Sequence, residues 1–170
     1  MVRPPFRDAA AIEIRPVDTE SDWDWLAGLW RDEWGGETMV SRGVIHKLVD
    51  QTALIAWRGE TRMGAATFFA SGRGWELTSI NALEPGLGIG SALLRAVEDA
   101  ARSAGAPRLW MITTNDNLDA LRFYQRRGYR LVAVHAGAVD DARELKPSIP
   151  EIGNHGIPIH DEIELEKRFD

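Results

Sequence analysis

The apolar positions of the chain change their spacing several times, and each change predicts where one secondary-structure element ends and another begins. Apolar and polar residues alternate over 12–17, which is typical of a half-buried strand. Residues 18–21 include three residues able to cap a helix, and from there the apolar positions follow helical spacing as far as Trp34. A second, short helix is predicted around residues 42–50.

The middle of the chain has the pattern of paired strands followed by a helix. Residues 52–58 and 62–71 are strand-like and flank a glycine-containing turn, which indicates a hairpin. A third strand is predicted at 72–83. The helix predicted at 88–104 has the clearest apolar face of the sequence, and a glycine follows its last residue.

The last third of the chain also alternates strands and helices. We predict a strand at 108–113, a helix at 117–128 capped by Asn117, a strand at 129–137 and a final strand at 161–169. Residues 138–160 are interrupted by proline and glycine and are expected to be rich in loops. Glutamates alternate along the final strand (Glu162, Glu164 and Glu166), so we expect this strand at an edge of the sheet with these side chains in water.

Composition and charge narrow the class of protein. The chain has 170 residues, enough for one domain with its own core, and residues 1–11 are expected to be frayed. The net charge of −6 argues against a nucleic-acid partner, because proteins that bind nucleic acids have a basic face. No apolar run approaches the ~20 residues needed to span a bilayer, so we expect a cytoplasmic protein without a membrane partner.

The cysteine and histidine content argues against cysteine chemistry and against a metal site. The chain has no cysteine, which excludes disulfides, zinc–thiolate sites and a cysteine nucleophile. Its four histidines do not cluster in a ligand pattern, so we expect no metal.

Three glycines at alternate positions, Gly86, Gly88 and Gly90, lie between a predicted strand and the 88–104 helix. The backbone N–H groups of such a turn can point at one spot, and together with the helix dipole they suit a phosphate or pyrophosphate. The alternative is a tight turn without a ligand. The spacing does not match the G-x-G-x-x-G dinucleotide pattern, and no lysine follows as in a P-loop, so both of those nucleotide-binding classes are excluded.

The glycine turn is one of a pair of motifs. The stretch GLGIGSALL (86–94) is followed, after a strand, by NLDALRFYQRRGYRL (117–131). Together they resemble the GNAT superfamily of N-acetyltransferases, over roughly residues 12–137. The family patterns are [RQ]-x-x-G-x-[GA] and N-x-x-A-x-x-x-Y-x-x-x-G-[FY], and the matching residues are Gly88 and Gly90, then Asn117, Ala120, Tyr124, Gly128 and Tyr129.

The resemblance implies a fold and a cosubstrate. The fold is α/β (α+β), with a mixed, mainly antiparallel central sheet of about seven strands flanked by helices, in one acetyltransferase domain over 1–170. The cosubstrate is acetyl-CoA. The residues expected to bind it are Asn81, Ala82 and Leu83 at the strand end, Leu87, Gly88, Ile89, Gly90 and Ser91 in the turn, and Asn117 and Tyr124 on the later helix. Pro85 stands where the family has Arg or Gln, and Arg95 is a candidate for the missing cation.

The same resemblance assigns the proton transfers. Tyr124 is expected to be the general acid that protonates the departing thiolate; the alternative is a tyrosine packed at a helix–strand junction. Glu76 is expected to accept the amine proton, with a solvated strand glutamate as the alternative. Glu84 is the second candidate base, and a water path that needs no base is also open.

The acceptor site is predicted less directly. The resemblance implies that the first helix and the residues after it border this site, so Trp30, Trp34 and Arg42 are candidates to line it. Aromatic faces beside acidic side chains suit an ammonium group. Tryptophans at helical spacing are more often core residues, which is the competing interpretation. The acceptor is expected to be the amine of a small molecule or a peptide.

These observations predict an acetyl-CoA-dependent N-acetyltransferase in which a primary amine attacks the thioester directly in a ternary complex, because no cysteine can form a covalent relay. A non-catalytic acyl-CoA-binding or regulatory module is the alternative, favoured by Pro85 and the open choice of base. A toxin that acetylates charged tRNA has this fold but disagrees with the acidic charge. The oligomeric state stays open, with a homodimer through the last strand as one option.

Overall fold

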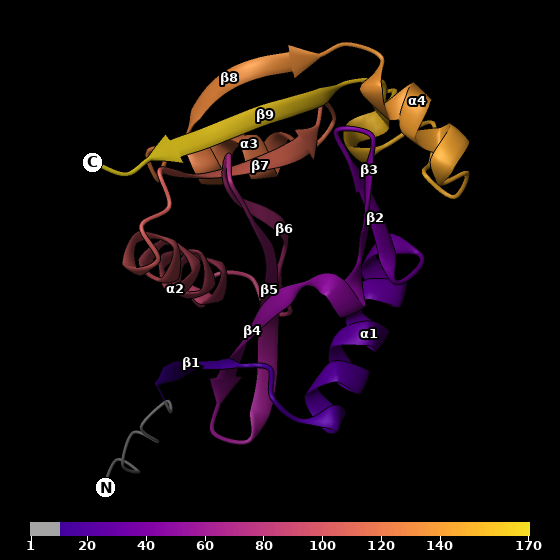
Figure 1. Cartoon of the computed structure of the whole chain (residues 1–170). Coiled ribbons are helices and arrows are strands. Elements are labelled where there is room, and N and C mark those ends of the chain that lie inside the picture. The colour runs from indigo at the N-terminus through magenta and orange to yellow at the C-terminus, as the bar shows by residue number, and fades with distance from the viewer. Residues whose placement is uncertain (1–10) are drawn as a thin grey trace, which may run out of the picture.

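The computed structural model describes residues 11–170 (Figure 1). The prediction that residues 1–11 are frayed falls almost wholly outside that range. The strands are β1 (Ile12–Pro16), β2 (Thr38–Ser41), β3 (Val44–Lys47), β4 (Thr52–Arg58), β5 (Thr61–Ser71), β6 (Gly74–Ala82), β7 (Arg108–Thr114), β8 (Arg130–His135) and β9 (Glu162–Arg168). The helices are α1 (Glu20–Trp34), α2 (Ile89–Ser103), α3 (Leu118–Gln125) and α4 (Ala138–Leu145), with 3₁₀ turns η1 (Leu48–Asp50) and η2 (Asn154–Gly156).

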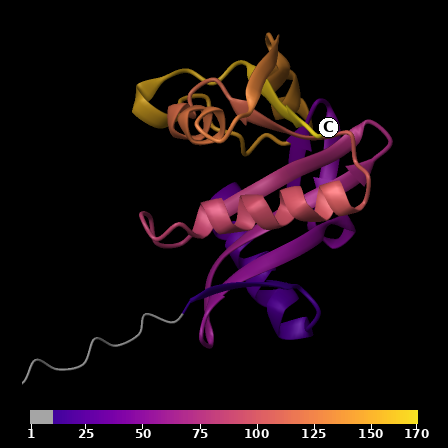
Figure 2. The ribbon, with the colours of Figure 1, turned by 90° about the vertical axis from the view of Figure 1, so that its left-hand side faces the viewer.

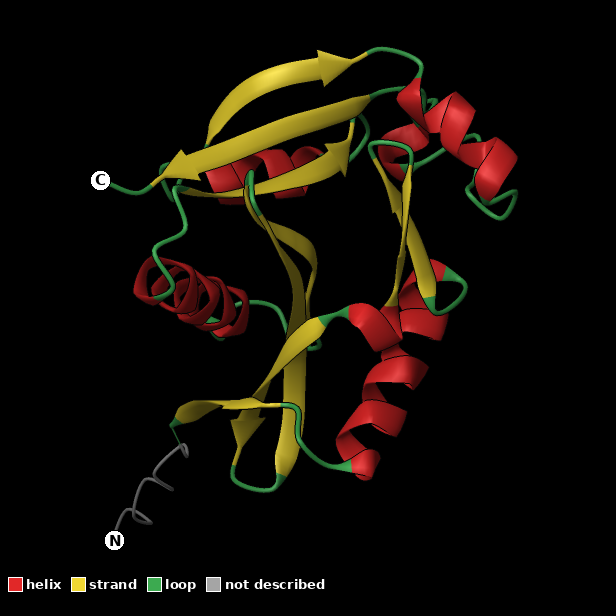
Figure 3. Cartoon of the chain, viewed as in Figure 1, coloured by secondary structure: helices red, strands yellow, loops and turns green. Residues whose placement is uncertain are grey.

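Seven strands form one sheet in the order β1-β4-β5-β6-β7-β9-β8 (Figures 1 and 3). β6 and β7 run parallel, and every other neighbouring pair in this sheet is antiparallel. Helices α1 and α2 pack against the sheet from opposite sides. The prediction of a mixed, mainly antiparallel sheet of about seven strands flanked by helices is confirmed.

Alternate side chains of the sheet belong to two separate apolar clusters. On β4, Ala56 packs in the cluster that includes α2, whereas Ile55 packs in the cluster that includes α1. Figure 2 shows α2 lying across one face of the sheet. Ile89, Leu93 and Val97 of α2 are fully or almost fully buried, because they recur at helical spacing on the side that meets the sheet.

β6 and β7 are neighbours over a short stretch only. Their register pairs Trp75 with Leu109 and Glu76 with Trp110 and then ends. Beyond Glu76 the two strands diverge, whereas β6 stays paired with β5 as far as Ala82. Among the described strands, none pairs with the β7-facing edge of β6 beyond Glu76, so its backbone groups there are open to a ligand.

The prediction of a helix at 42–50 is wrong. β2 and β3 form a separate two-stranded hairpin in this region, followed by η1. Arg42 and Gly43 make its two-residue turn with φ of 52° and 72°, the positive values that such turns require. β-branched Val44 and Ile45 then favour a strand over a helix.

The prediction that the final strand lies at an edge is also wrong, because β9 lies between β7 and β8. Charged side chains are accommodated there because they are paired: Arg108 lies 3.2 Å from Glu164 and 2.6 Å from Glu166, and His135 Nε2 lies 2.9 Å from Glu164. Glu162 is only 3% exposed, so these glutamates do not face water as expected. Both edges of β9 are paired within the chain, which leaves it no free edge for a homodimer.

Residues 138–160, predicted as loop-rich, begin with the helix α4. Gly137 takes a left-handed conformation (φ 73°) at its N-cap and so separates this helix from β8. The remainder is loop apart from η2 and an isolated bridge between Ile152 and Pro158.

Candidate active site

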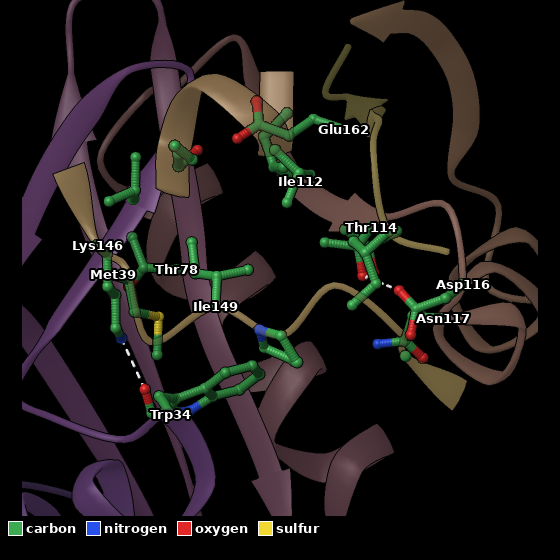
Figure 4. Close-up of a pocket in the computed structure, with 18 of the residues that line it drawn as sticks. Trp34, Met39, Thr78, Ile112, Thr114, Asp116, Asn117, Lys146, Ile149 and Glu162 are labelled. Carbon is green, nitrogen blue, oxygen red and sulfur yellow. Dashed lines mark hydrogen bonds between the residues drawn. The ribbon is translucent and has the colours of Figure 1, made fainter. Parts of the chain in front are cut away.

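A cavity of about 530 Å³ lies beside the point where β6 and β7 diverge (Figure 4). Its walls come from the end of α1, the β2–β3 hairpin, β6, β7, α4, the loop after α4 and the start of β9. A volume of this size is typical of sites for small molecules. Segments from both ends of the chain therefore enclose one concave site.

Glu76 lines this cavity and yet is only 5% exposed. Its Oε1 accepts a hydrogen bond from Ser41 Oγ at 2.5 Å, and its Oε2 lies 3.4 Å from His46 Nε2. Burial raises the pKa of Glu76 to about 7; the hydrogen bond from Ser41 opposes this, and the charges of Glu162 and Glu164 add to it. A carboxyl group with this pKa exchanges its proton near neutral pH.

His46 is the neighbour of Glu76 that the sequence analysis did not single out. It lines the cavity, is 7% exposed, and its Nε2 has no hydrogen-bond partner among the described residues. Burial lowers the pKa of His46, so the ring is neutral at neutral pH. His46 therefore faces Glu76 as a neutral imidazole whose ring packs edge-on against Phe69.

A second buried carboxylate, Glu162, lines the same cavity. Its two oxygens share the backbone N–H of Arg42, at 3.3 and 3.2 Å, and Arg42 Nη1 lies 3.9 Å away. Burial raises the pKa of Glu162, while the interactions with Arg42 act in the opposite sense. In the register of β7 and β9, Glu162 lies opposite Thr114, which also lines the cavity (Figure 4). Successive residues of the β2–β3 hairpin, Ser41 and Arg42, thus each hold one of the two buried carboxylates.

Lys146 and Trp34 form another part of the wall (Figure 4). Lys146 Nζ donates hydrogen bonds to the backbone carbonyls of Trp34 and Thr38, each at 2.6 Å. Burial lowers the pKa of Lys146. Met39 and Ile149 complete an apolar surface beside it. This lysine, the one Lys or Arg among the lining residues, therefore joins the end of α4 to α1 and β2.

The loop after α4 is held over the cavity by Asp116. This buried carboxylate accepts hydrogen bonds from the backbone and side-chain N–H groups of Asn154, at 2.8 and 3.0 Å, and from Thr114 Oγ1 at 2.5 Å. A Cβ atom at Gly153 would overlap the Asp116 carboxylate and the side chain of Ile159. Close approach therefore requires glycine at this position.

The three predicted acceptor-site residues occupy different environments. Trp30 is fully buried in the cluster under α1 and does not line the cavity. Trp34 is 38% exposed and lines it, as does Glu33. Arg42 is not among the lining residues, but its backbone amide holds Glu162, which is.

The glycine turn before α2 has the geometry of an open backbone cradle. Gly86 and Gly88 have φ of 82° and 75°, and a Cβ atom at either would meet no atom within 4 Å. Backbone conformation rather than crowding therefore demands glycine there. Gly88 caps α2 without a side-chain hydrogen bond, so the first-turn amides, including those of Ile89 and Gly90, have no partner within the helix and can bind an anion.

Arg127 brings a positive charge to this turn. Its Nε and Nη2 donate to Ser91 Oγ at 3.2 and 2.6 Å, and its Nη1 donates to the carbonyl of Phe123. Burial lowers the pKa of Arg127, as do the neighbouring charges of Arg126 and Arg95. The guanidinium group is thus held beside the first turn of α2 by contacts that span two helices.

Arg95, Arg126 and Arg127 line one hollow between α2 and the end of α3. Lys167 also lines it but bonds to both oxygens of Glu98, at 3.1 and 3.0 Å. None of the three arginines is ion-paired with a carboxylate of residues 11–170. The hollow therefore holds three uncompensated positive charges next to the glycine turn, a suitable environment for phosphate groups.

The predicted general acid lies in the main core. Tyr124 is 6% exposed and packs edge-on against Phe123 and Tyr129. Burial raises the pKa of Tyr124, so the phenol stays protonated at neutral pH. It does not line the cavity that holds Glu76, whereas Asn117 does, while also capping α3 through a 3.1 Å bond from the amide of Ala120.

The predicted cosubstrate-binding residues of β6 lie at its open end. Asn81 and Ala82 are the last residues of the strand, and Leu83 follows with 47% of its surface exposed. The Asn81 Oδ1 atom is buried and has no hydrogen-bond partner among the described residues. Glu84 is exposed near this end of β6. Unlike Glu76, it does not line the cavity.

Three parts of the site escaped the sequence analysis: His46, the inward position of Glu162, and the loop that closes the cavity. His46 fell in a segment predicted to be helical, and Glu162 in a strand predicted to face water. Their partners are distant along the chain, since Arg42 and Glu162 are 120 residues apart. Gly43, followed by the β-branched residues Val44 and Ile45, was the available local signal for the hairpin that brings them together.

Residues 11–170 contain no group of three or more His, Asp or Glu side chains placed to hold a metal ion. Within the same range, none of the helices combines the length and the apolar character needed to cross a membrane.

Comparison with known proteins gives a family and a fold. The family model described as the acetyltransferase (GNAT) family matches residues 20–129. The uncharacterized protein YdhI of Bacillus subtilis (strain 168) is 40% identical over 147 residues, which cover 85% of this chain and 91% of that protein.

Two solved structures share the fold at low identity. A GNAT family acetyltransferase from Elizabethkingia anophelis with acetyl-CoA bound matches with a TM-score of 0.69 at 20% identity, over 96% of this chain and 100% of that one. The ribosomal-protein-S18-alanine N-acetyltransferase from Escherichia coli matches with a TM-score of 0.66 at 13% identity, over 93% and 94%. Because the family model matches more than half of its residues, this chain belongs to the acetyltransferase (GNAT) family.

Proposed function

We propose that this protein is an N-acetyltransferase of one domain that transfers the acetyl group of acetyl-CoA to an amine. The observation that carries the proposal is Glu76, a buried carboxyl group with a pKa of about 7 that lines a concave site where β6 and β7 separate. An amine must lose a proton to form an amide, and a carboxylate titrating near neutral pH is suited to accept it. The shared fold with an enzyme named as an alanine N-acetyltransferase supports an amine as the acceptor.

The donor is assigned to the open side of β6 and to the glycine turn. Backbone amides from Leu87 to Ser91 would bind the pyrophosphate, and the open edge near Asn81 would pair with the pantetheine arm as an added strand does. Pro85 has no N–H and no side-chain donor to offer. Arg127 supplies the missing positive charge, because its guanidinium group bonds to Ser91 in the first turn of α2.

The proposed reaction is direct attack without a covalent enzyme intermediate. The amine nitrogen bonds to the thioester carbon and its proton passes to Glu76. The carbon–sulfur bond breaks, and Tyr124 gives a proton to the sulfur, so the products are an amide and the CoA thiol. Burial keeps Tyr124 protonated until that step. Solvent then removes the proton from Glu76 and returns one to Tyr124, which restores the enzyme.

Pro85 favours a second function, a module that binds acyl-CoA without turnover. The loss of a donor at this position weakens the cradle, although the main-chain amides and Arg127 remain. Such a module would bind acetyl-CoA and release no thiol with any amine.

A kinetic test distinguishes the role of Tyr124 as the acid from the role of Arg127 in binding the phosphate groups. Thiol release from acetyl-CoA is followed with a panel of alkylamines, diamines, amino acids and short peptides, using the native protein, Tyr124→Phe and Arg127→Gln. With the best amine, Tyr124→Phe should lower kcat by about 10- to 100-fold without changing the KM for acetyl-CoA, because only the acid is lost. Arg127→Gln should raise that KM about tenfold with kcat unchanged.

Arg122→Gln is the matched control, because Arg122 lies on the same helix as Tyr124 with its side chain exposed beside Asp119. It should leave both constants unchanged. Binding of acetyl-CoA without thiol release for any amine would replace the enzyme by the binding module. An unchanged kcat for Tyr124→Phe would remove the tyrosine from the mechanism.

A further inference from the structure

Two buried carboxylates face one cavity, and among residues 11–170 the Arg42 guanidinium group is the one Lys or Arg charge within 4 Å of either. Glu76 and Glu162 both line it, and each is at most 5% exposed. Ser41 Oγ bonds to one and the amide of Arg42 to the other. Because these two donors are adjacent in the chain, the carboxylates lie within about 10 Å of each other.

The positive groups around the pair are bonded to other partners, except Arg42, whose contact with Glu162 is long and partly exposed to solvent. Lys146 has its ammonium group bonded to two backbone carbonyls. Arg42 Nη1 lies 3.9 Å from Glu162, and the side chain of Arg42 is 42% exposed. His135 pairs with Glu164, which in turn is bonded to Arg108. The cavity therefore has an excess of negative charge, to which Glu33 adds at the end of α1.

An independent observation indicates a ligand at this position. His46 is 93% buried, since 7% of it is exposed, lines the cavity beside Glu76, and has an Nε2 atom without a hydrogen-bond partner among the described residues. A buried polar atom of this kind costs free energy unless a ligand or water satisfies it. The same surface includes the apolar side chains of Met39 and Ile149.

We infer that the acetyl acceptor carries a second positive charge, as a linear diamine or polyamine does, and that Glu162 binds this charge. The inference rests on the proposed function. Glu76 takes the proton of the reacting amine, while the second ammonium group forms a charge-assisted hydrogen bond with Glu162. A chain of roughly three or four carbons, bent rather than fully extended, reaches the two carboxylates with a hydrogen bond at each end. The methylene groups between them would contact the apolar part of the wall.

Three amines of equal chain length test this directly. 1,4-Diaminobutane, butylamine and 4-aminobutanoate differ only in having a cation, a methyl group or an anion at the far end. With acetyl-CoA and the native protein, kcat/KM should be at least about tenfold higher for the diamine than for butylamine, and lowest for the amino acid. 2-Phenylethylamine is added as an apolar acceptor of similar length.

Glu162→Gln shows whether Glu162 causes the preference. It should remove most of the advantage in kcat/KM that the diamine has over butylamine. Glu166→Gln is the matched control, because Glu166 lies on the same strand and pairs with Arg108 and Arg168 outside the cavity. It should keep the preference of the native protein.

Each other outcome overturns the inference. Equal or higher kcat/KM for butylamine, 4-aminobutanoate or 2-phenylethylamine would show that no second cation is recognised. So would a diamine preference that Glu162→Gln leaves intact. No transfer to the diamine by a protein that binds acetyl-CoA would also reject it, whereas failure to bind acetyl-CoA would reject the proposed function itself.

Discussion

At the scale of single residues, the properties of Glu76 follow from what surrounds its carboxyl group. The side chain is buried, and two other carboxylates lie near enough to raise its pKa further, to about 7. Ser41 opposes this with one short hydrogen bond, and His46 is neutral and contributes no charge. The same burial that makes Glu76 a suitable base also makes its ionised form costly for the folded protein.

The first prediction concerns the stability of Glu76→Gln at two pH values. The pKa of Glu76 is higher in the folded state than in the unfolded chain, where it is near 4.5. The contribution of protonated Glu76 to the free energy of unfolding is therefore fully present below the unfolded pKa of about 4.5. It is lost as the pH rises from about 4.5 through 7. Glu76→Gln, which cannot ionise, should exceed the native protein in unfolding free energy by roughly 1–3 kcal/mol at pH 8 and match it at pH 4.

Urea denaturation of both proteins at the two pH values measures this difference. The rate of acetyl transfer by the native protein should rise as the pH increases through about 7, because only the ionised carboxylate accepts a proton. Identical free energies of unfolding of the two proteins at pH 8 would show that ionisation of Glu76 does not destabilise the folded protein.

At the scale of elements, the cavity exists because the β2–β3 hairpin and the loop after α4 close over the gap beside β6. The hairpin brings Ser41, Arg42 and His46 to the carboxylates. The loop is held by Asp116, through its bonds to Asn154. Neither segment belongs to the seven-stranded sheet, so a single contact has a large effect on its position.

The second prediction concerns Gly153→Ala in this loop. The added methyl group would overlap the Asp116 carboxylate and Ile159, both fixed by their own contacts. The loop should move outward, and the KM for the amine should rise several-fold while acetyl-CoA binding stays unchanged, because the glycine turn is elsewhere. Steady-state kinetics with each substrate varied in turn measures both effects.

Gly72→Ala is the control for a glycine replacement as such. A Cβ atom at Gly72 would meet nothing within 4 Å, so neither constant should change. If Gly153→Ala kept the native KM for the amine, the loop would have no part in binding the acceptor.

At the scale of the whole molecule, the sequence predicted most elements and the sheet class but not the neighbours of each strand. α2 and β4 were predictable because their apolar spacing is regular and their ends carry turn residues. The placement of β9 between β7 and β8 was not, because its glutamates alternate as they do on an exposed strand. Partners from other segments, Arg108 and His135 on neighbouring strands and Arg42 in the hairpin, explain why these charges are tolerated inside.

The candidate site, too, was predictable from the sequence only in part. The glycine turn and Tyr124 belong to continuous motifs and were found in the sequence. The partners of Glu76 come from a hairpin that local pattern mistook for a helix, and Glu162 comes from the far end of the chain. Arg127 lay in a visible basic run, but its bond to Ser91 depends on how two helices pack.

The central claim is that the turn from Gly86 to Ser91 binds the pyrophosphate of acetyl-CoA, and calorimetric titration tests it most directly. Acetyl-CoA is titrated into the native protein, into Gly88→Glu, and into Gly72→Glu, which places the same charge in an open turn away from α2. We predict micromolar binding by the native protein and by Gly72→Glu, and none by Gly88→Glu, because a carboxylate there would occupy and repel the anion site. No binding by the native protein, or equal binding by Gly88→Glu, would contradict the account.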